Sequence, residues 1–208
     1  MNQYSIFACR GFITICLILC NCAKSLGADS ENAVLVEAQH VAAVKYTNFK
    51  YGSDFALHQV NCVQFIGSVL ESWIGRDLTK PEQDAVYIGG PFDDINKSVA
   101  NGDERTKGVV YAITKVMKIG NEIQIKDARP GDIIQYWIKR KNGAWMGHSA
   151  IISEVWNDSN HQIRAALYGA HESTDGISFT KFSDGNGLWL NGPDRKVYIA
   201  RLTCVKSK

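Results

Sequence analysis

The chain has 208 residues, of which 45% are hydrophobic and 21% are charged, with 18 glycines and only 4 prolines. This composition is typical of a globular protein and excludes a disordered chain, a collagen-like repeat and a coiled coil. The formal net charge is only +2. No basic field therefore favours nucleic acid or an anionic membrane surface as a partner.

The N-terminal segment carries the longest apolar run, GFITICLILC, over residues 11–20, and Arg10 precedes it. Ten residues are too few to span a bilayer. With a basic flank before it and small residues after it, the run is typical of a secretory signal. We therefore expect a signal peptide over residues 1–27 and one domain over residues 28–208. The domain would be exported to the periplasm, the cell surface or the medium, with no stable membrane insertion after cleavage.

The cysteines leave two questions open. Lipidation at Cys20 or Cys22 competes with simple secretion, but leucine and asparagine precede these cysteines where a small residue is usual. Cleavage would leave only Cys62 and Cys204, and an exported protein meets oxidising conditions. A Cys62 to Cys204 disulfide is one interpretation, and a free, reactive Cys62 is the other.

Helical patterns fill the first half of the chain. Apolar residues recur at helical spacing over residues 33–46 and 61–74, and a third helix is expected over residues 104–117. Residues 79–101 contain proline, paired glycines and paired aspartates. They indicate a partly helical surface insertion.

Strand patterns fill the second half. Short β-branched or aromatic runs are separated by Gly, Asn and Asp clusters, and they cover residues 131–139, 148–156, 163–170, 177–182 and 197–202. Helices followed by a meander of strands predict an α+β fold with an antiparallel sheet.

One cysteine falls at the start of a predicted helix. The apolar face of this helix is formed by Cys62, Phe65, Ile66, Val69, Leu70 and Trp73. Asn61 is a favourable N-cap, which places Cys62 in the first turn. Free backbone N–H groups and the helix dipole favour a thiolate there, and the thiolate is the nucleophilic form of cysteine.

Two histidines are expected to face each other on neighbouring strands. If residues 148–156 and 163–171 form a hairpin with Trp156 opposite Ile163, then His148 lies opposite His171. Alternation places an apolar set on the same face, namely Ala150, Ile152, Ala165, Leu167 and Gly169. A slip of one residue would move one of the histidines to the other face.

These residues predict a Cys-His-His triad. Cys62 would be the nucleophile, His148 the base that later protonates the leaving amine, and His171 the group that orients His148. The backbone N–H of Cys62 would stabilise the oxyanion, and Gln59 and Tyr51 are the candidate side-chain donors. Zinc held by the same three residues is the metal alternative, but no close ligand pair supports it. We expect no metal and no cofactor.

Four blocks in chain order resemble those of NlpC-type papain-like cysteine peptidases, and most of all the putative amidase-domain branch of that superfamily. The blocks are residues 61–65 (NCVQF), 129–137 (RPGDIIQYW), 147–152 (GHSAII) and 169–174 (GAHEST). The resemblance implies a papain-like fold, in which the helix that carries the nucleophile packs on an antiparallel sheet. It also implies hydrolysis of amide bonds, commonly in bacterial cell-wall peptides, with the cysteine as nucleophile and the first histidine as base.

The chain departs from that pattern in several places. Asn61 replaces the usual Asp, Val63 and Gln64 replace Thr-Asn, and the spacing from Cys62 to His148 is long. The residues between, 75–128, would be an insertion on the side of the cleft.

The expected function is that of an exported cysteine hydrolase (amidase or endopeptidase) that cleaves an amide bond in peptidoglycan or another peptide. A secreted, disulfide-bonded binding domain and a thiol acyltransferase on the same fold are the alternatives.

Overall fold

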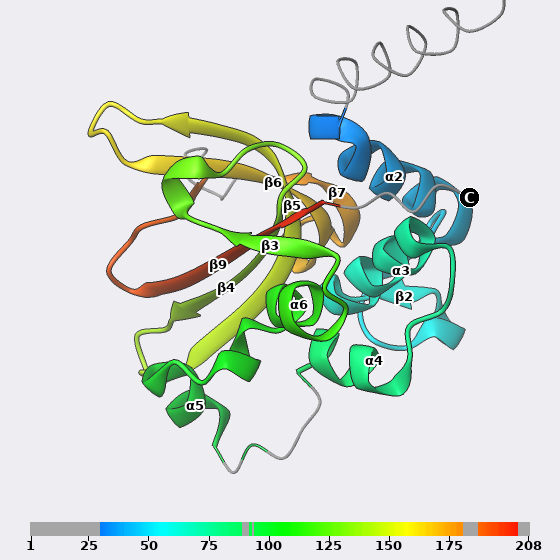
Figure 1. The fold of residues 1–208 in the computed structure, drawn as a ribbon, viewed down its shortest axis with the longest axis horizontal. Coiled ribbons are helices and arrows are strands. Elements are labelled where there is room, and N and C mark those ends of the chain that lie inside the picture. Colours follow the sequence, from blue (N-terminus) through cyan, green and yellow to red (C-terminus); the bar gives the residue numbers. More distant parts are fainter. Residues whose placement is uncertain (1–29, 89–91, 93, 181–186, 204–208) are drawn as a thin grey trace, which may run out of the picture. The chain divides into compact units, whose positions relative to one another are not determined.

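The computed structural model describes residues 30–88, 92, 94–180 and 187–203 (Figure 1). By its contacts the chain divides into residues 1–31 and residues 32–208. The expected signal segment and Cys204 lie outside the described residues. Within the described ranges, no helix is long and apolar enough to cross a membrane.

The first half of the described chain is mostly helical. In chain order the helices are α2 (Ser30–Lys45), α3 (Cys62–Ile74), α4 (Lys80–Val86), α5 (Ile95–Asn101) and α6 (Val109–Tyr111), and α6 continues as a π-helical turn, η3 (Ala112–Val116). Short 3₁₀ turns lie at η1 (Phe55–Leu57), η2 (Glu104–Lys107), η4 (Ile125–Asp127) and η5 (Glu172–Thr174). The two predicted helices over residues 33–46 and 61–74 are confirmed.

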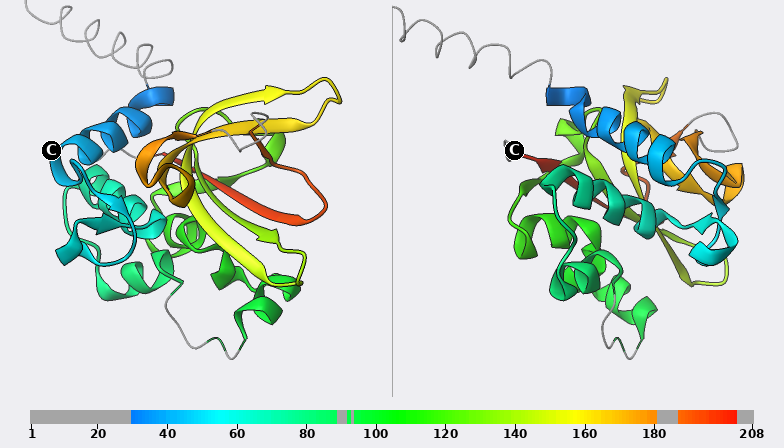
Figure 2. Two further views of the ribbon diagram at one scale, coloured as in Figure 1. Left: turned by 180° about the vertical axis from the view of Figure 1, so that it is seen from behind. Right: turned by 90° about the vertical axis from the view of Figure 1, so that its right-hand side faces the viewer.

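The second half forms an antiparallel sheet, so the predicted α+β class is confirmed (Figures 1 and 2). Its strands are β3 (Gly120–Ile123), β4 (Ile133–Lys139), β5 (Trp145–Asn157), β6 (Ile163–His171), β7 (Gly176–Thr180), β8 (Leu188–Trp189) and β9 (Arg195–Leu202). The order is β3-β9-β4-β5-β6-β7, and β8 pairs with β6. Two short strands, β1 (Lys50–Tyr51) and β2 (Gln59–Val60), pair in parallel before α3.

The prediction of one continuous helix over residues 104–117 is wrong. The helical structure is interrupted at Gly108, where φ is 49°, a backbone conformation that favours glycine. A Cβ there would lie only 2.9 Å from Cδ1 of Ile88 and 3.0 Å from Oε1 of Gln135. Gly108 therefore separates the 3₁₀ turn η2 from the helical segment that begins with α6.

Residues 75–128, which the sequence indicates as an insertion, contribute to both the sheet and the core. Strand β3 forms the edge of the sheet next to β9, and α6 packs on β4. Within the expected surface insertion, Val86 and Val99 are fully buried. Val86 belongs to the same core cluster as Val109, Val110 and Ile113, which lie further along this segment.

Two apolar layers lie on the two faces of the sheet. One joins α2, α3 and α6 to the face that carries Ile133, Ile151 and Ala170. The other covers the opposite face and consists of Ile134, Tyr136, Ala150, Ile152, Ala165, Leu167, Leu188, Leu190 and Ile199. Burying one such aliphatic side chain contributes about 1.5–3 kcal/mol. The first layer fixes α3 on β5 and β6, where the candidate site lies.

Candidate active site

Helix α3 begins as the sequence predicts, with Asn61 as its N-cap. Asn61 and Gln64 form a reciprocal capping box, in which the N–H of Gln64 donates to Oδ1 of Asn61 and the N–H of Asn61 donates to Oε1 of Gln64, both at 2.9 Å. Such a pair satisfies two donors that the helix start leaves open. Asn61 and Gln64, which differ from the residues usual in the blocks that the sequence resembles, thus position Cys62 in the first turn.

Cys62 is a free cysteine and is only 9% exposed. Backbone N–H groups of Ser149 and Val63 point at its sulfur and lower the pKa of the thiol, but burial outweighs them and raises it. The expectation of a thiolate favoured by the helix start is therefore corrected. Burial destabilises the charged sulfur more than the hydrogen bonds from backbone N–H groups stabilise it, so the pKa of Cys62 is raised. At neutral pH Cys62 is therefore a thiol.

The two histidines meet as predicted, although the predicted pairing near the turn is wrong. Trp156 lies opposite Arg164, not Ile163, and a β-bulge between Ile152 and Glu154 then shifts the register by one residue. Beyond the bulge Ile152 pairs with Leu167, which restores the register that brings His148 beside His171.

His148 and His171 are joined ring to ring. Nε2 of His148 lies 2.9 Å from Nδ1 of His171, a hydrogen-bond distance, and the ring centroids are 4.9 Å apart. Burial lowers the pKa of His148 to about 3, with a further contribution from His171, and lowers the pKa of His171 to about 4. Both rings are therefore neutral at pH 7.

Because one proton is shared between two neutral rings, their tautomers are linked. If Nε2–H of His148 donates to Nδ1 of His171, then Nδ1 of His148 is bare and can accept a proton. In the reverse case Nδ1 of His171 donates, and His148 carries its proton on Nδ1. Only the first arrangement leaves His148 able to act as a base.

A cleft of about 670 Å³ opens over the histidine pair. It is lined by Tyr51, Tyr136, Arg140, Met146, Gly147, His148, His171, Glu172, Ser173, Thr174 and Thr180. Cys62 is not among the lining residues, but its sulfur accepts a hydrogen bond from the backbone N–H of Ser149, next to His148. Burial first, and then charge on Cys62, raise the pKa of the lining residues Tyr51 and Tyr136. Among the described residues, no hydrogen bond joins the sulfur of Cys62 to His148. Catalytic contacts often close only when substrate binds.

The two predicted oxyanion donors differ in position. Tyr51 lines the cleft, and burial followed by charge on Cys62 raises its pKa, so it keeps its proton. Gln59 is not among the lining residues. Its Oε1 accepts from the N–H of Asp54 at 3.3 Å, and its side chain packs over Gly52. Trp145, at the start of β5, is not among the lining residues either, and the ammonium groups of Lys139 and Lys196 lie over its ring.

Several cleft residues were not predicted. Tyr136 is the β4 partner of His148, and its ring lies 5.5 Å from the imidazole. Arg140 and Met146 come from the β4-β5 hairpin, and Glu172 follows His171 in the chain. The register of the β4-β5 hairpin would have identified Tyr136, since residues opposite a site histidine share its face.

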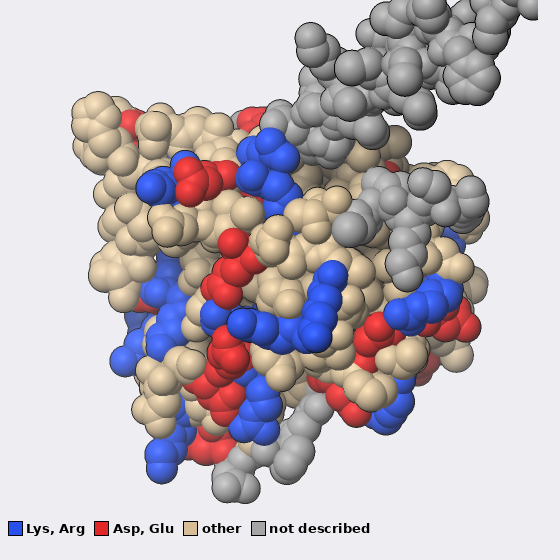
Figure 3. Space-filling model, in the orientation of Figure 1, with Lys and Arg blue, Asp and Glu red and all other residues tan. Residues whose placement is uncertain are grey.

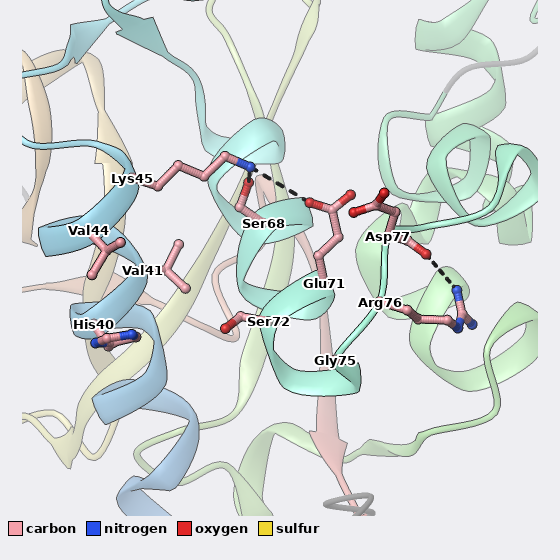
Figure 4. Close-up of a pocket in the computed structure, with 10 residues that line it drawn as sticks. All are labelled: His40, Val41, Val44, Lys45, Ser68, Glu71, Ser72, Gly75, Arg76 and Asp77. Atoms are coloured by element: carbon pink, nitrogen blue, oxygen red, sulfur yellow. Dashed lines mark hydrogen bonds and ion pairs between the residues drawn. The ribbon is translucent and has the colours of Figure 1, made fainter. Parts of the chain in front are cut away.

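A second hollow, of about 460 Å³, lies between α2 and α3 (Figure 4). The ammonium group of Lys45 reaches from α2 to Oγ of Ser68 at 2.8 Å and to a carboxylate oxygen of Glu71 at 3.8 Å. Oγ of Ser68 also bonds the hydroxyl of Tyr46. Lys45, Ser68 and Glu71 are thus engaged with one another, and none of the predicted site residues lines this hollow.

Charges of both signs are interspersed on the face drawn in Figure 3, where Lys and Arg side chains lie next to Asp and Glu. That face shows no continuous basic surface of the kind that nucleic-acid binding requires.

Comparison with protein-family models, with curated proteins and with solved structures finds no match for the chain. In the described part of the chain, no group of three or more His, Cys, Asp or Glu side chains is arranged to hold a metal ion.

The raised pKa of Cys62 predicts how alkylation depends on pH. The rate of modification by iodoacetamide should stay low at neutral pH and rise with pH beyond the ordinary thiol range, since only the thiolate reacts. The measurement is the fraction of Cys62 alkylated at each pH, determined by peptide mass spectrometry so that Cys204 is counted separately. A rate that is already maximal at pH 6 would show a thiolate–imidazolium pair in the resting protein instead.

Proposed function

We propose that the protein is an exported cysteine hydrolase of papain-like type that cleaves an amide bond in cell-wall peptides, with Cys62, His148 and His171 as its triad. The observation that carries this proposal is the ring-to-ring hydrogen bond of His148 and His171 at the base of a cleft, beside a free cysteine in the first turn of a helix. A nucleophile, a base and an orienting group in that order make up a covalent hydrolase site.

The proposed first half-reaction forms an acyl-enzyme. Nδ1 of His148 takes the thiol proton of Cys62 as the sulfur attacks the carbonyl carbon of the amide. The backbone N–H of Cys62 and the hydroxyl of Tyr51 donate to the oxyanion. When the carbon–nitrogen bond breaks, His148 returns the proton to the leaving amine, and the acyl group stays on sulfur as a thioester.

The second half-reaction releases the acid. His148 takes a proton from water, the resulting hydroxide attacks the thioester carbon, and the carbon–sulfur bond breaks. The proton then returns to sulfur, which regenerates the Cys62 thiol and the neutral imidazole. An amine in place of water would give acyl transfer instead, so the acyltransferase alternative differs only in the acceptor.

Two observations support the cell wall as the substrate. The N-terminal segment has the pattern of an export signal, and the four sequence blocks resemble a superfamily that commonly cleaves cell-wall peptides. The disulfide-bonded binding domain needs Cys62 to be bonded, whereas the structure has it as a free cysteine.

Digestion of purified peptidoglycan tests the proposal. Wild-type protein should release fragments with new free amines at one defined bond, and Cys62→Ala should release none. Fragments are identified by mass spectrometry. An absence of fragments from several wall types, together with transfer of an acyl group to an added amine, would favour the acyltransferase.

A further inference from the structure

Two buried polar atoms beside the site have no hydrogen-bond partner among the described residues. They are Nε2 of His171, whose side chain is 5% exposed, and Oγ of Ser178. Buried polar atoms are rarely left unsatisfied, because each lost hydrogen bond is costly in a dry environment. The position of these two atoms therefore needs an explanation.

The sheet register places both on the same face. On β6 and β7, His171 pairs with Gly176 and Gly169 pairs with Ser178, so Ser178 is the diagonal neighbour of His171 across the two strands. Gly169 lies between them without a side chain. A Cβ at Gly169 would lie 3.7 Å from Nε2 of His171 and 3.5 Å from Cβ of Ala150, both ordinary contact distances. Gly169 therefore leaves the position next to Nε2 free of a side chain, and an alanine methyl group would fit there without a clash.

What occupies this space decides the tautomer of the histidine pair. A hydrogen-bond acceptor next to Nε2 of His171 holds a proton on that nitrogen. Nδ1 of His171 must then accept from Nε2 of His148, which leaves Nδ1 of His148 bare and basic. Without an acceptor, the proton on Nε2 would be buried and unsatisfied, and the reverse tautomer would be favoured.

We propose that Ser178 is a positioning residue, whose hydroxyl accepts the Nε2 proton of His171 through one ordered water over Gly169 and so keeps His148 in its basic tautomer. A single water can bridge diagonal positions that are too far apart for a direct bond, and two polar partners are enough to hold it. The inference rests on the proposed function for its catalytic consequence, but its structural part does not depend on catalysis.

Nitrogen-15 NMR of the histidine rings at pH 7 tests the structural part. Wild type should show both His148 and His171 protonated at Nε2. In Ser178→Ala the pair should move toward protonation at Nδ1, whereas Ser178→Thr, which keeps the hydroxyl, should retain the wild-type tautomer. An unchanged spectrum in Ser178→Ala would overturn the inference.

Gly169→Ala tests the bridging water with every polar group left in place. The added methyl group occupies the space next to Nε2 without a clash, so it should shift the tautomer as Ser178→Ala does. A wild-type spectrum in Gly169→Ala would show that no water is needed there and would overturn the bridge.

Kinetics separate this inference from the proposed function. Ser178→Ala should lower kcat about tenfold with KM unchanged, as expected for the loss of one hydrogen bond, and Ser178→Thr should restore it. Full activity in Ser178→Ala would overturn the positioning role. If Cys62→Ala kept full activity while Ser178→Ala changed the tautomer, the proposed function would fail and the hydrogen-bond chain would stand.

Discussion

Cys62→Ala and His148→Ala are each expected to abolish hydrolysis while the protein stays folded. Alanine at residue 62 removes the only atom that can hold the acyl group, and removal of such a nucleophile costs about 10⁶ in kcat in a comparable triad. Alanine at residue 148 removes the proton acceptor, and a general base of this kind raises the reaction rate by a factor of about 10²–10⁴. The measurement is the initial rate of amine release, with far-UV circular dichroism to confirm folding.

His171→Ala is expected to leave residual activity, because an orienting ring fixes a tautomer but transfers no proton to substrate. His161→Asn is the matched control: His161 is exposed and has φ of 58°, which asparagine adopts readily. It should retain the wild-type rate. Equal and complete loss in the His148 and His171 variants would leave the orienting role unsupported, and activity in Cys62→Ala would contradict the mechanism.

Asp132→Asn is expected to cause a large loss of stability. The side chain of Asp132 is 1% exposed and accepts from Nε and Nη2 of Arg201 at 2.8 and 2.9 Å and from the N–H of Arg129 at 2.9 Å. Neutralising one partner leaves the guanidinium without its buried counter-charge, and breaking such a pair costs about 3–5 kcal/mol. Urea unfolding measures the change.

Asp84→Asn provides the control for that measurement. Asp84 pairs with Lys80 one turn earlier in α4, and the two side chains are 43% and 78% exposed. An exposed pair contributes only about 0–1 kcal/mol, so this variant should unfold near the wild-type midpoint. Equal losses in the two variants would show that burial does not set the strength of the Asp132 pair. A loss confined to Asp132→Asn would also explain the aspartate that follows glycine in the sequence block over residues 129–137, because it would show that this aspartate has a structural role.

Helix α3 and its cap could be predicted because both depend on local sequence. The apolar period over residues 61–74 and an asparagine before it are enough to place Cys62 in the first turn. The pairing of His148 with His171 follows from counting residues along the predicted hairpin, starting from Trp156 opposite Ile163. That starting pair is wrong, but the bulge after Ile152 shifts the register by one residue, so the predicted histidine partners are right. No sequence pattern indicated that bulge.

Other features depend on tertiary contacts and could not be predicted. The ionisation of Cys62 depends on how deeply the helix start is buried, which capping residues do not reveal. Gln59 was predicted by its spacing alone, but its side chain is held by the N–H of Asp54. Strand β3 is four residues long and gains its stability by pairing with β9, so its own sequence carries little signal.

The central claim is that Cys62 is the nucleophile, and selective alkylation tests it most directly. The protein is treated with iodoacetamide for increasing times, and the unmodified fraction of Cys62 and of Cys204 is determined by peptide mass spectrometry at each time. Amine release from peptidoglycan is measured on the same samples. The account predicts that activity falls in proportion to unmodified Cys62, reaches zero when none is left, and does not follow Cys204. Hydrolysis that persists after complete alkylation of Cys62 would contradict it.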